Sequence, residues 1–204
     1  MKYRKTLWIT QTAVLIALLL TAQFFSKALG QYVTGSMVNF ILVIGTMICG
    51  LASGLVVAAV SPVLAFLLGI GPALPQLLPV MVLGNASIVL IWHFIAGRAK
   101  GKAVYYLYPV AFVVGAAVKF CILYFGIVQI ILPLLSLPEA HIKVLSATFS
   151  FPQLITAGIG GTLAGIITPL LRRVLPQSMM QVRVEEQDTI KEEKASEKEA
   201  EQQP

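Results

Sequence analysis

Long apolar runs constrain the fold of this chain more than any other feature of its sequence. A helix needs about 20 mostly apolar residues to cross the roughly 30 Å hydrocarbon layer of a membrane. The sequence contains six candidate runs, at residues 7–26, 38–53, 55–70, 74–97, 104–132 and 150–171. Only 12% of the residues are charged, about half the fraction that is usual for a soluble domain. These runs predict an all-α membrane protein.

The second and third runs are almost continuous, and their division decides how many times the chain crosses the membrane. A single helix over residues 38–70 would measure about 50 Å, which is too long for one crossing. Gly50, Ser53 and Gly54 supply a place where the chain can turn. We therefore expect two helices in this region and six in total.

The positions of the basic residues give an independent test of this number, because cytoplasmic loops carry an excess of Lys and Arg. Three basic clusters flank the runs: Lys2, Arg4 and Lys5 precede the first, Arg98, Lys100 and Lys102 follow the fourth, and Arg172 and Arg173 follow the sixth. All three fall on one side of the membrane only if an even number of helices separates them. The pattern predicts a multi-pass, six-transmembrane-helix bundle with cytoplasmic N and C termini. We expect the first run to remain uncleaved, since Leu20-Thr21-Ala22 is a poor signal-peptidase site.

The charge distribution divides the chain into two parts. Of the 9 acidic residues, 8 lie within residues 185–204, whereas residues 1–184 contain Glu139 alone. Residues 1–176 are expected to form a six-helix transmembrane domain, the part of the chain in which the candidate substrate-binding residues lie. From Val182 onward the chain lacks an apolar face, and we expect residues 177–204 to form a charged, disordered cytoplasmic tail; docking of this tail on a basic partner is the alternative.

Motifs for several functional classes are missing from the sequence. It contains no GxSxG, HExxH or GxxxxGK[ST] pattern, and the apolar runs carry no pair of acidic residues. Cys49 and Cys121 lie inside apolar runs without a CxxC motif and are expected to be reduced core residues. The basic residues form small clusters rather than a stripe on a soluble domain. We therefore expect no enzymatic activity, no metal, no cofactor and no nucleic-acid partner.

Lys119 is the one ionisable residue that stands deep inside an apolar run. An unpaired charge at such a depth costs on the order of 2.5–3.5 kcal/mol, and no acidic residue in the runs can neutralise it. The functional interpretation is that a ligand carboxylate or phosphate pairs with this ammonium. The alternatives are a side chain that snorkels towards the membrane surface, a neutral amine, or an ammonium held by carbonyl groups and helix ends.

Four polar residues in the outward halves of other helices are further candidates for substrate binding: Asn39, Gln76, Asn85 and Gln153. Asn39 is expected to open the second helix, and Asn85 lies deepest. For each of them alone, the simpler interpretation is a hydrogen bond between helices or a residue at the membrane interface. The loop Lys27–Met37 ahead of the second helix could form a lid.

Small residues recur at one-turn spacing in two helices. Ala13 and Ala17 form such a pair in the first helix, and Ala157, Gly161 and Gly165 continue the pattern in the last. Small side chains allow close approach of helices in a membrane. Internal packing of the bundle is the simplest interpretation for the last helix, and it is equally open for the first.

Six short helices, the Ala-x-x-x-Ala pair, the basic loop after the fourth helix and the stretch SPVLAFLLGIGPALPQLLPVMVLGNA resemble the S component of an energy-coupling factor (ECF) vitamin transporter. The resemblance covers about residues 1–173. It implies a prokaryotic plasma-membrane protein that captures a vitamin or related micronutrient. It also implies docking on a transmembrane T component that two cytoplasmic ATPases drive, followed by toppling in the membrane.

The resemblance also implies roles for individual residues. The docking surface of the family matches Ala13 and Ala17, and its substrate pocket corresponds loosely to Asn85, Lys119 and Gln153. If Lys119 is the counter-ion, an acidic vitamin such as a folate, pantothenate, niacin or biotin is favoured over a cationic one. Two alternatives remain open: a membrane scaffold or morphogenesis protein that does not transport, and a small stand-alone channel, carrier or unrecognised intramembrane enzyme.

Overall fold

The computed structural model describes residues 2–97, 99 and 101–175, with side chains from residue 6 onwards. This described part consists of helices and turns without a strand, as the sequence predicts. The helices are α1 (Lys2–Ser26), α2 (Gln31–Cys49), α3 (Leu51–Leu67), α4 (Leu78–Ile91), α5 (Ala103–Leu123), α6 (Leu132–Leu134), α7 (Glu139–Thr148) and α8 (Phe151–Val174). The π-helical segments Trp92–Ala96 and Tyr124–Ile131 continue α4 and α5. The expected tail, residues 177–204, lies outside the described residues.

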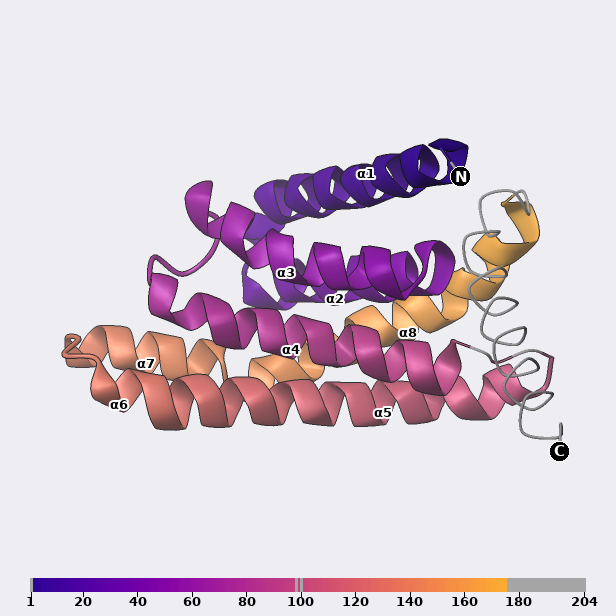
Figure 1. The fold of residues 1–204 in the computed structure, drawn as a ribbon. Coiled ribbons are helices and arrows are strands. Elements are labelled where there is room, and N and C mark those ends of the chain that lie inside the picture. Colours follow the sequence, from indigo (N-terminus) through magenta and orange to yellow (C-terminus); the bar gives the residue numbers. More distant parts are fainter. Residues whose placement is uncertain (1, 98, 100, 176–204) are drawn as a thin grey trace, which may run out of the picture.

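The long helices lie side by side as a bundle, and the first residues of α1 and the last residues of α8 lie at the same end of it (Figure 1). Five helical segments in the described part are long and apolar enough to cross a membrane. The sixth, α3, has 17 residues, which is near the lower limit of about 17 for a crossing helix. The helices are therefore compatible with a multi-pass membrane protein.

The turn between α2 and α3 is tighter than expected. Gly50 alone separates the two helices and has φ +94°, a conformation that residues with a Cβ rarely adopt. Ser53 and Gly54 lie inside α3, where Ser53 Oγ accepts a 2.9 Å hydrogen bond from Thr12 Oγ1 of α1. The expectation of two separate helices holds, and the serine serves to join α1 to α3.

Helix α2 begins earlier than the sequence predicts. The expected loop Lys27–Met37 is wrong, because a 3₁₀ turn (Lys27–Leu29) and Gly30 alone connect α1 to α2. Thr34 Oγ1 donates a 3.0 Å hydrogen bond to the Ser26 carbonyl, which ties the new first turns of α2 to the end of α1. Asn39 consequently lies about 12 Å along α2 rather than at its start.

Helices α2 and α8 are packed too closely for side chains at their crossing. A Cβ atom on Gly160 would lie 2.6 Å from the Ser36 carbonyl oxygen and 2.7 Å from Asn39 Cβ. Such distances bring the two backbones into contact, as small residues allow in membrane bundles. Gly160 thereby fixes Asn39 against α8 and in the centre of the bundle.

Candidate ligand-binding site

Lys119 lies inside the bundle and binds two asparagine side chains. Its Nζ donates hydrogen bonds of 2.6 Å to Asn39 Oδ1 and 2.8 Å to Asn85 Oδ1. All three side chains are buried, and Lys119 is only 4% exposed. The Lys119 amine therefore does not snorkel towards the membrane surface; two side-chain carbonyl groups accept its hydrogen bonds.

Three different helices bring Lys119, Asn39 and Asn85 together near the middle of the bundle's length. Lys119 lies about 24 Å from the first residue of α5, near the middle of the continuous helical stretch Ala103–Leu134. Asn85 lies near the middle of the stretch Pro75–Ala96. The early start of α2 places Asn39 at a matching depth. Helix packing alone thus brings Lys119 into contact with Asn39, which is 80 residues away in the sequence, and with Asn85, which is 34 residues away.

A cavity of about 110 Å³ lies beside this cluster. A water molecule needs at least about 10–15 Å³ of such space, so the cavity has room for several waters or a compact organic molecule. It is lined by residues of every helix except α6, including Gln23, Gln31, Thr34, Asn39, Ser61, Met81, Asn85, Lys119, Thr148, Phe149 and Gln153. Lys119 and its two asparagines therefore face a space that can hold a ligand.

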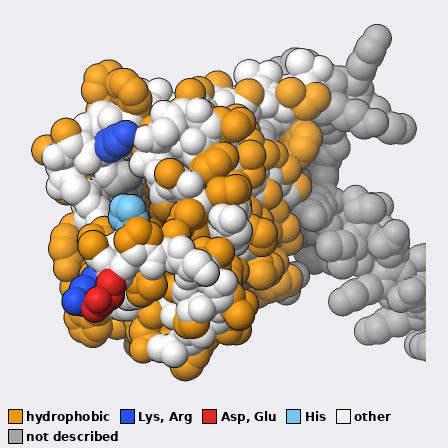
Figure 2. All heavy atoms as spheres, turned by 90° about the vertical axis from the view of Figure 1, so that its left-hand side faces the viewer, with side chains coloured by type: hydrophobic (Ala, Val, Ile, Leu, Met, Phe, Trp, Pro, Cys, Tyr) orange, Lys and Arg blue, Asp and Glu red, His pale blue; other side chains and the backbone are white. Residues whose placement is uncertain are grey.

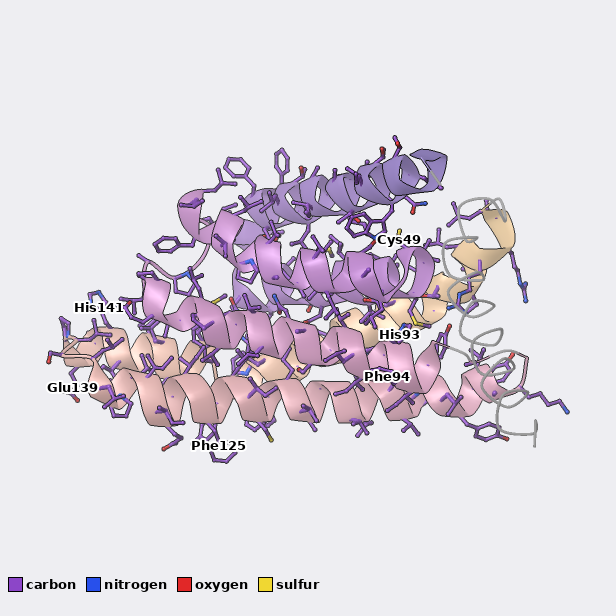
Figure 3. The ribbon with its side chains drawn as sticks, viewed as in Figure 1. Cys49, His93, Phe94, Phe125, Glu139 and His141 are labelled. Atoms are coloured by element: carbon purple, nitrogen blue, oxygen red, sulfur yellow. The ribbon has the colours of Figure 1, made fainter. Side chains whose placement is uncertain are left out.

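The cavity lies towards the end of the bundle where α7 meets the α3–α4 connection. Gln31 at the start of α2 and Gly71 in that connection belong to its lining. Figure 2 shows this end as a largely uncharged surface with few basic, acidic or histidine side chains. Glu139 and His141 of α7 lie at the same end in Figure 3, and Glu139 pairs with Lys143 at 3.1 Å.

The remaining predicted site residues divide into two groups. Gln153 is buried, lines the cavity and donates a 3.0 Å hydrogen bond from Nε2 to the Thr148 carbonyl. Gln76 lies exposed in the 3₁₀ turn Pro75–Leu77 and is not among the cavity-lining residues. The structure thus gathers Asn39, Asn85, Lys119 and Gln153 around one space and leaves Gln76 outside it.

Several polar residues of this site were not predicted from the sequence. Thr156 of α8 lies 3.5 Å from Asn39 Nδ2, a long and weak contact. Gln23, Gln31, Thr34 and Ser61 also line the cavity. The spacing of Gln153 and Thr156, three residues apart on one helix face, is the one signal that pointed to Thr156. Gln23 and Ser61 lie in mostly apolar helices and belong to no motif, so only the packing reveals their position.

The charge of the site is unbalanced. A lysine ammonium has three donors and no acceptor, and two of the donors are used by the asparagines. Within residues 6–175 the only acidic side chain is Glu139, which is exposed at the end of the bundle. The two asparagine carbonyl groups accept hydrogen bonds from Nζ but carry no negative charge, so a protonated Lys119 keeps one N–H for a ligand and has no acidic side chain beside it among the described residues.

No group of three or more His, Cys, Asp or Glu side chains that could hold a metal ion occurs in the described part of the chain. Cys49 is buried and Cys121 is exposed, and both are free thiols. The chemistry that Lys119 and its two asparagines support is the binding of an anion.

No family model, curated protein or solved structure matches this chain. The arrangement of Lys119, Asn39 and Asn85 around the cavity therefore carries the functional argument.

Ala13 and Ala17, the predicted docking pair, are exposed on α1. The opposite face of α1 packs inward through Thr12, Leu15 and Leu19, which are buried. The alanine pair is therefore not used for packing within the described part of the bundle and leaves a smooth strip on its surface.

Proposed function

We propose that the chain is the substrate-capture subunit, or S component, of an ECF-type importer for a vitamin or related micronutrient with an anionic group. The observation that carries this proposal is the buried Lys119 ammonium, which faces a cavity and has no acidic partner inside the bundle. An anion from outside supplies the missing charge. The bound carboxylate accepts the free N–H of Lys119, and Gln153 and Gln23 contact the rest of the molecule.

The size of the cavity supports a narrower choice of ligand. A volume of about 110 Å³ favours a compact acid, and a larger vitamin requires the lining helices to move apart. Ligand sites of drug-sized molecules usually span about 300–1,000 Å³. We therefore place compact monocarboxylic acids ahead of large, polyanionic ones as candidate cargo.

Two further features support a subunit that works with partners. The exposed strip of Ala13 and Ala17 offers a close-packing surface for a transmembrane T component. The described residues contain no nucleotide-binding motif, so two cytoplasmic ATPases supply the energy. In this proposal both termini face the cytoplasm, and the cavity end of the bundle faces outwards.

Affinity purification of the full chain from its own membranes tests this function. We expect a T component and two ATPases to co-purify, and ATP-driven uptake of a bound acid to require all of them in proteoliposomes. A chain that conducts ions by itself in liposomes would be a channel. A chain that retains neither partner proteins of this kind nor a small molecule would be a scaffold, and either result would overturn the proposal.

A further inference from the structure

A second hollow lies on the side of the bundle between α5 and α8, and its lining shares no residue with that of the Lys119 cavity. It encloses about 610 Å³. Gly161 and Gly165 of α8 belong to its lining, and aromatic residues of α5 line it from the other helix. We call this hollow the α5–α8 groove; its lining includes Tyr105, Tyr108, Phe112, Gly161, Gly165 and Arg173.

The glycines of α8 explain why the groove is open. A Cβ atom at Gly165 would lie 3.5 Å from Tyr108 Cδ2, which is ordinary van der Waals contact. Gly165 is therefore not required by close packing against α5, in contrast to Gly160 at the α2 crossing. The small-residue stripe of α8 serves packing at Ala157, which is buried, and leaves space beside Gly165.

The length of the groove matches one leaflet of a membrane. Gly161 and Arg173 are twelve residues apart on one continuous helix, which corresponds to about 18 Å. Half of a hydrocarbon core of roughly 30 Å is about 15 Å. A lipid acyl chain that begins at the level of Arg173 therefore ends near Gly161, close to the middle of the membrane.

The end of the groove at Arg173 is basic. Arg173 is exposed at the end of α8, and Tyr105 is 78% exposed near the start of α5. Lys102 and Arg172 lie at the same end of the bundle as these residues. Glu139, the one acidic residue of the described ranges with side chains, lies at the opposite end of the bundle and pairs with Lys143. Arg173 thus offers a positive charge at headgroup level that no described side chain neutralises.

We infer that the α5–α8 groove binds one anionic phospholipid of the leaflet at the basic end of the bundle. An acyl chain fills the apolar hollow beside Gly165, and the headgroup phosphate binds Arg173. A basic residue near a membrane surface favours anionic lipids, whereas a transmembrane helix of a partner would bring mainly apolar side chains to this level. This lipid site is independent of the cargo proposed for the Lys119 cavity.

Native mass spectrometry of the full chain, released from bilayer nanodiscs of equal parts phosphatidylglycerol and phosphatidylcholine, tests this site. We expect the wild type to retain one lipid, mainly phosphatidylglycerol. Arg173→Gln removes the headgroup contact, and we expect the ratio of bound phosphatidylglycerol to phosphatidylcholine to fall about fivefold. Gly165→Leu fills the hollow, and we expect it to reduce retention of both lipids.

Two variants serve as controls. Gly165→Ala adds one methyl group in ordinary contact distance and should fold and bind lipid nearly as the wild type does. Lys143→Gln removes a positive charge at the other end and should leave the lipid ratio unchanged. Equal retention of the two lipids by the wild type, or an unchanged ratio in Arg173→Gln, would overturn the inference. Cross-linking of Gly165→Cys to another protein chain in place of lipid would overturn it as well.

Discussion

Lys119 is solvated by two amide carbonyl groups that cannot cancel its charge. Each carbonyl oxygen lies within 2.8 Å of Nζ, so the hydrogen bonds offset part of the cost of burial. Removing one asparagine would leave a donor unsatisfied, and replacing it with a carboxylate would remove the need for an external anion. The effects of these two kinds of substitution on stability and on ligand retention distinguish a structural role of Lys119 from a ligand-binding role.

Asn85→Asp is the more informative substitution at this scale. A carboxylate in place of the amide would pair with Lys119 across about the same distance, so we expect the protein to fold with equal or higher thermal stability. The internal pair competes with a bound acid, and we expect at least about tenfold weaker retention of that acid. Thermal unfolding and mass analysis of released small molecules measure the two effects.

Gln76→Glu is the matched control for Asn85→Asp. It introduces the same charge near the start of the same helical stretch, but at an exposed position that does not line the cavity. We expect it to leave acid retention unchanged. If Asn85→Asp retained as much acid as the wild type, Lys119 would not be the counter-ion of a ligand.

Four residues of this site, Asn39, Asn85, Lys119 and Gln153, could be predicted from the sequence, but the contacts between them could not. Lys119 was predicted from its depth in an apolar run without acids, and that argument needs no structure. The pairing of Lys119 with Asn39 and Asn85 depends on the relative heights and rotations of three helices. Hydropathy fixes neither of these quantities, so the cluster could not be assembled from the sequence alone.

At the scale of elements, the contact between α2 and α8 sets the position of Asn39. Gly160→Ala would push a methyl group into the Ser36 carbonyl and Asn39 Cβ, and backbone atoms cannot move aside as a flexible side chain can. We expect it to destabilise the fold by about 1–3 kcal/mol, as overpacking does, and to weaken acid retention by displacing Asn39. Thermal unfolding in detergent measures the first effect.

Gly158→Ala provides the comparison on the same helix. Its Cβ would lie 3.4 Å from the Phe112 ring, a contact that is tolerated with little movement. We expect stability and acid retention close to those of the wild type. Equal effects of the two substitutions would show that the α2–α8 crossing is not the determinant of the site.

Helix boundaries show where hydropathy fails as a guide. Residues 31–37 contain Gln, Tyr, Thr, Gly and Ser, so they interrupt the apolar pattern and were expected to form a loop. In the structure Gln31 and Thr34 face the cavity, and Ser36 is buried against α8. Polar residues that face a cavity or a neighbouring helix are compatible with a membrane helix. Helix α7 was not predicted for the same reason, because its polar sequence, with Glu139, His141 and Lys143, does not form an apolar run.

At the scale of the whole molecule, the proposed function requires a surface that is not used within the bundle. Replacing both Ala13 and Ala17 with leucine roughens the exposed strip of α1 without touching the buried side of the helix. We expect the double variant to retain the acid as the wild type does and to lose co-purification of the T component by at least about tenfold. Quantitative pull-down of the full complex measures this loss.

A neighbouring stripe of α1 supplies the control. Val14 and Leu18 are exposed at 60% and 54%, and have the same spacing as the alanine pair. The double substitution Val14→Leu with Leu18→Phe adds bulk beside the strip, and we expect normal partner binding. Loss of the partner in this control as well, or its retention in the alanine variant, would refute a specific role for Ala13 and Ala17.

The direct measurement of the central claim is the small-molecule content of the purified full chain. We expect mass spectrometry to find about one equivalent of a compact organic acid released from the wild type and none from Lys119→Met, with both proteins equally folded by circular dichroism. Lys119→Met removes the ammonium and leaves the cavity in place. Retention of the same molecule by both proteins, or release of a cationic molecule from the wild type, would contradict the account.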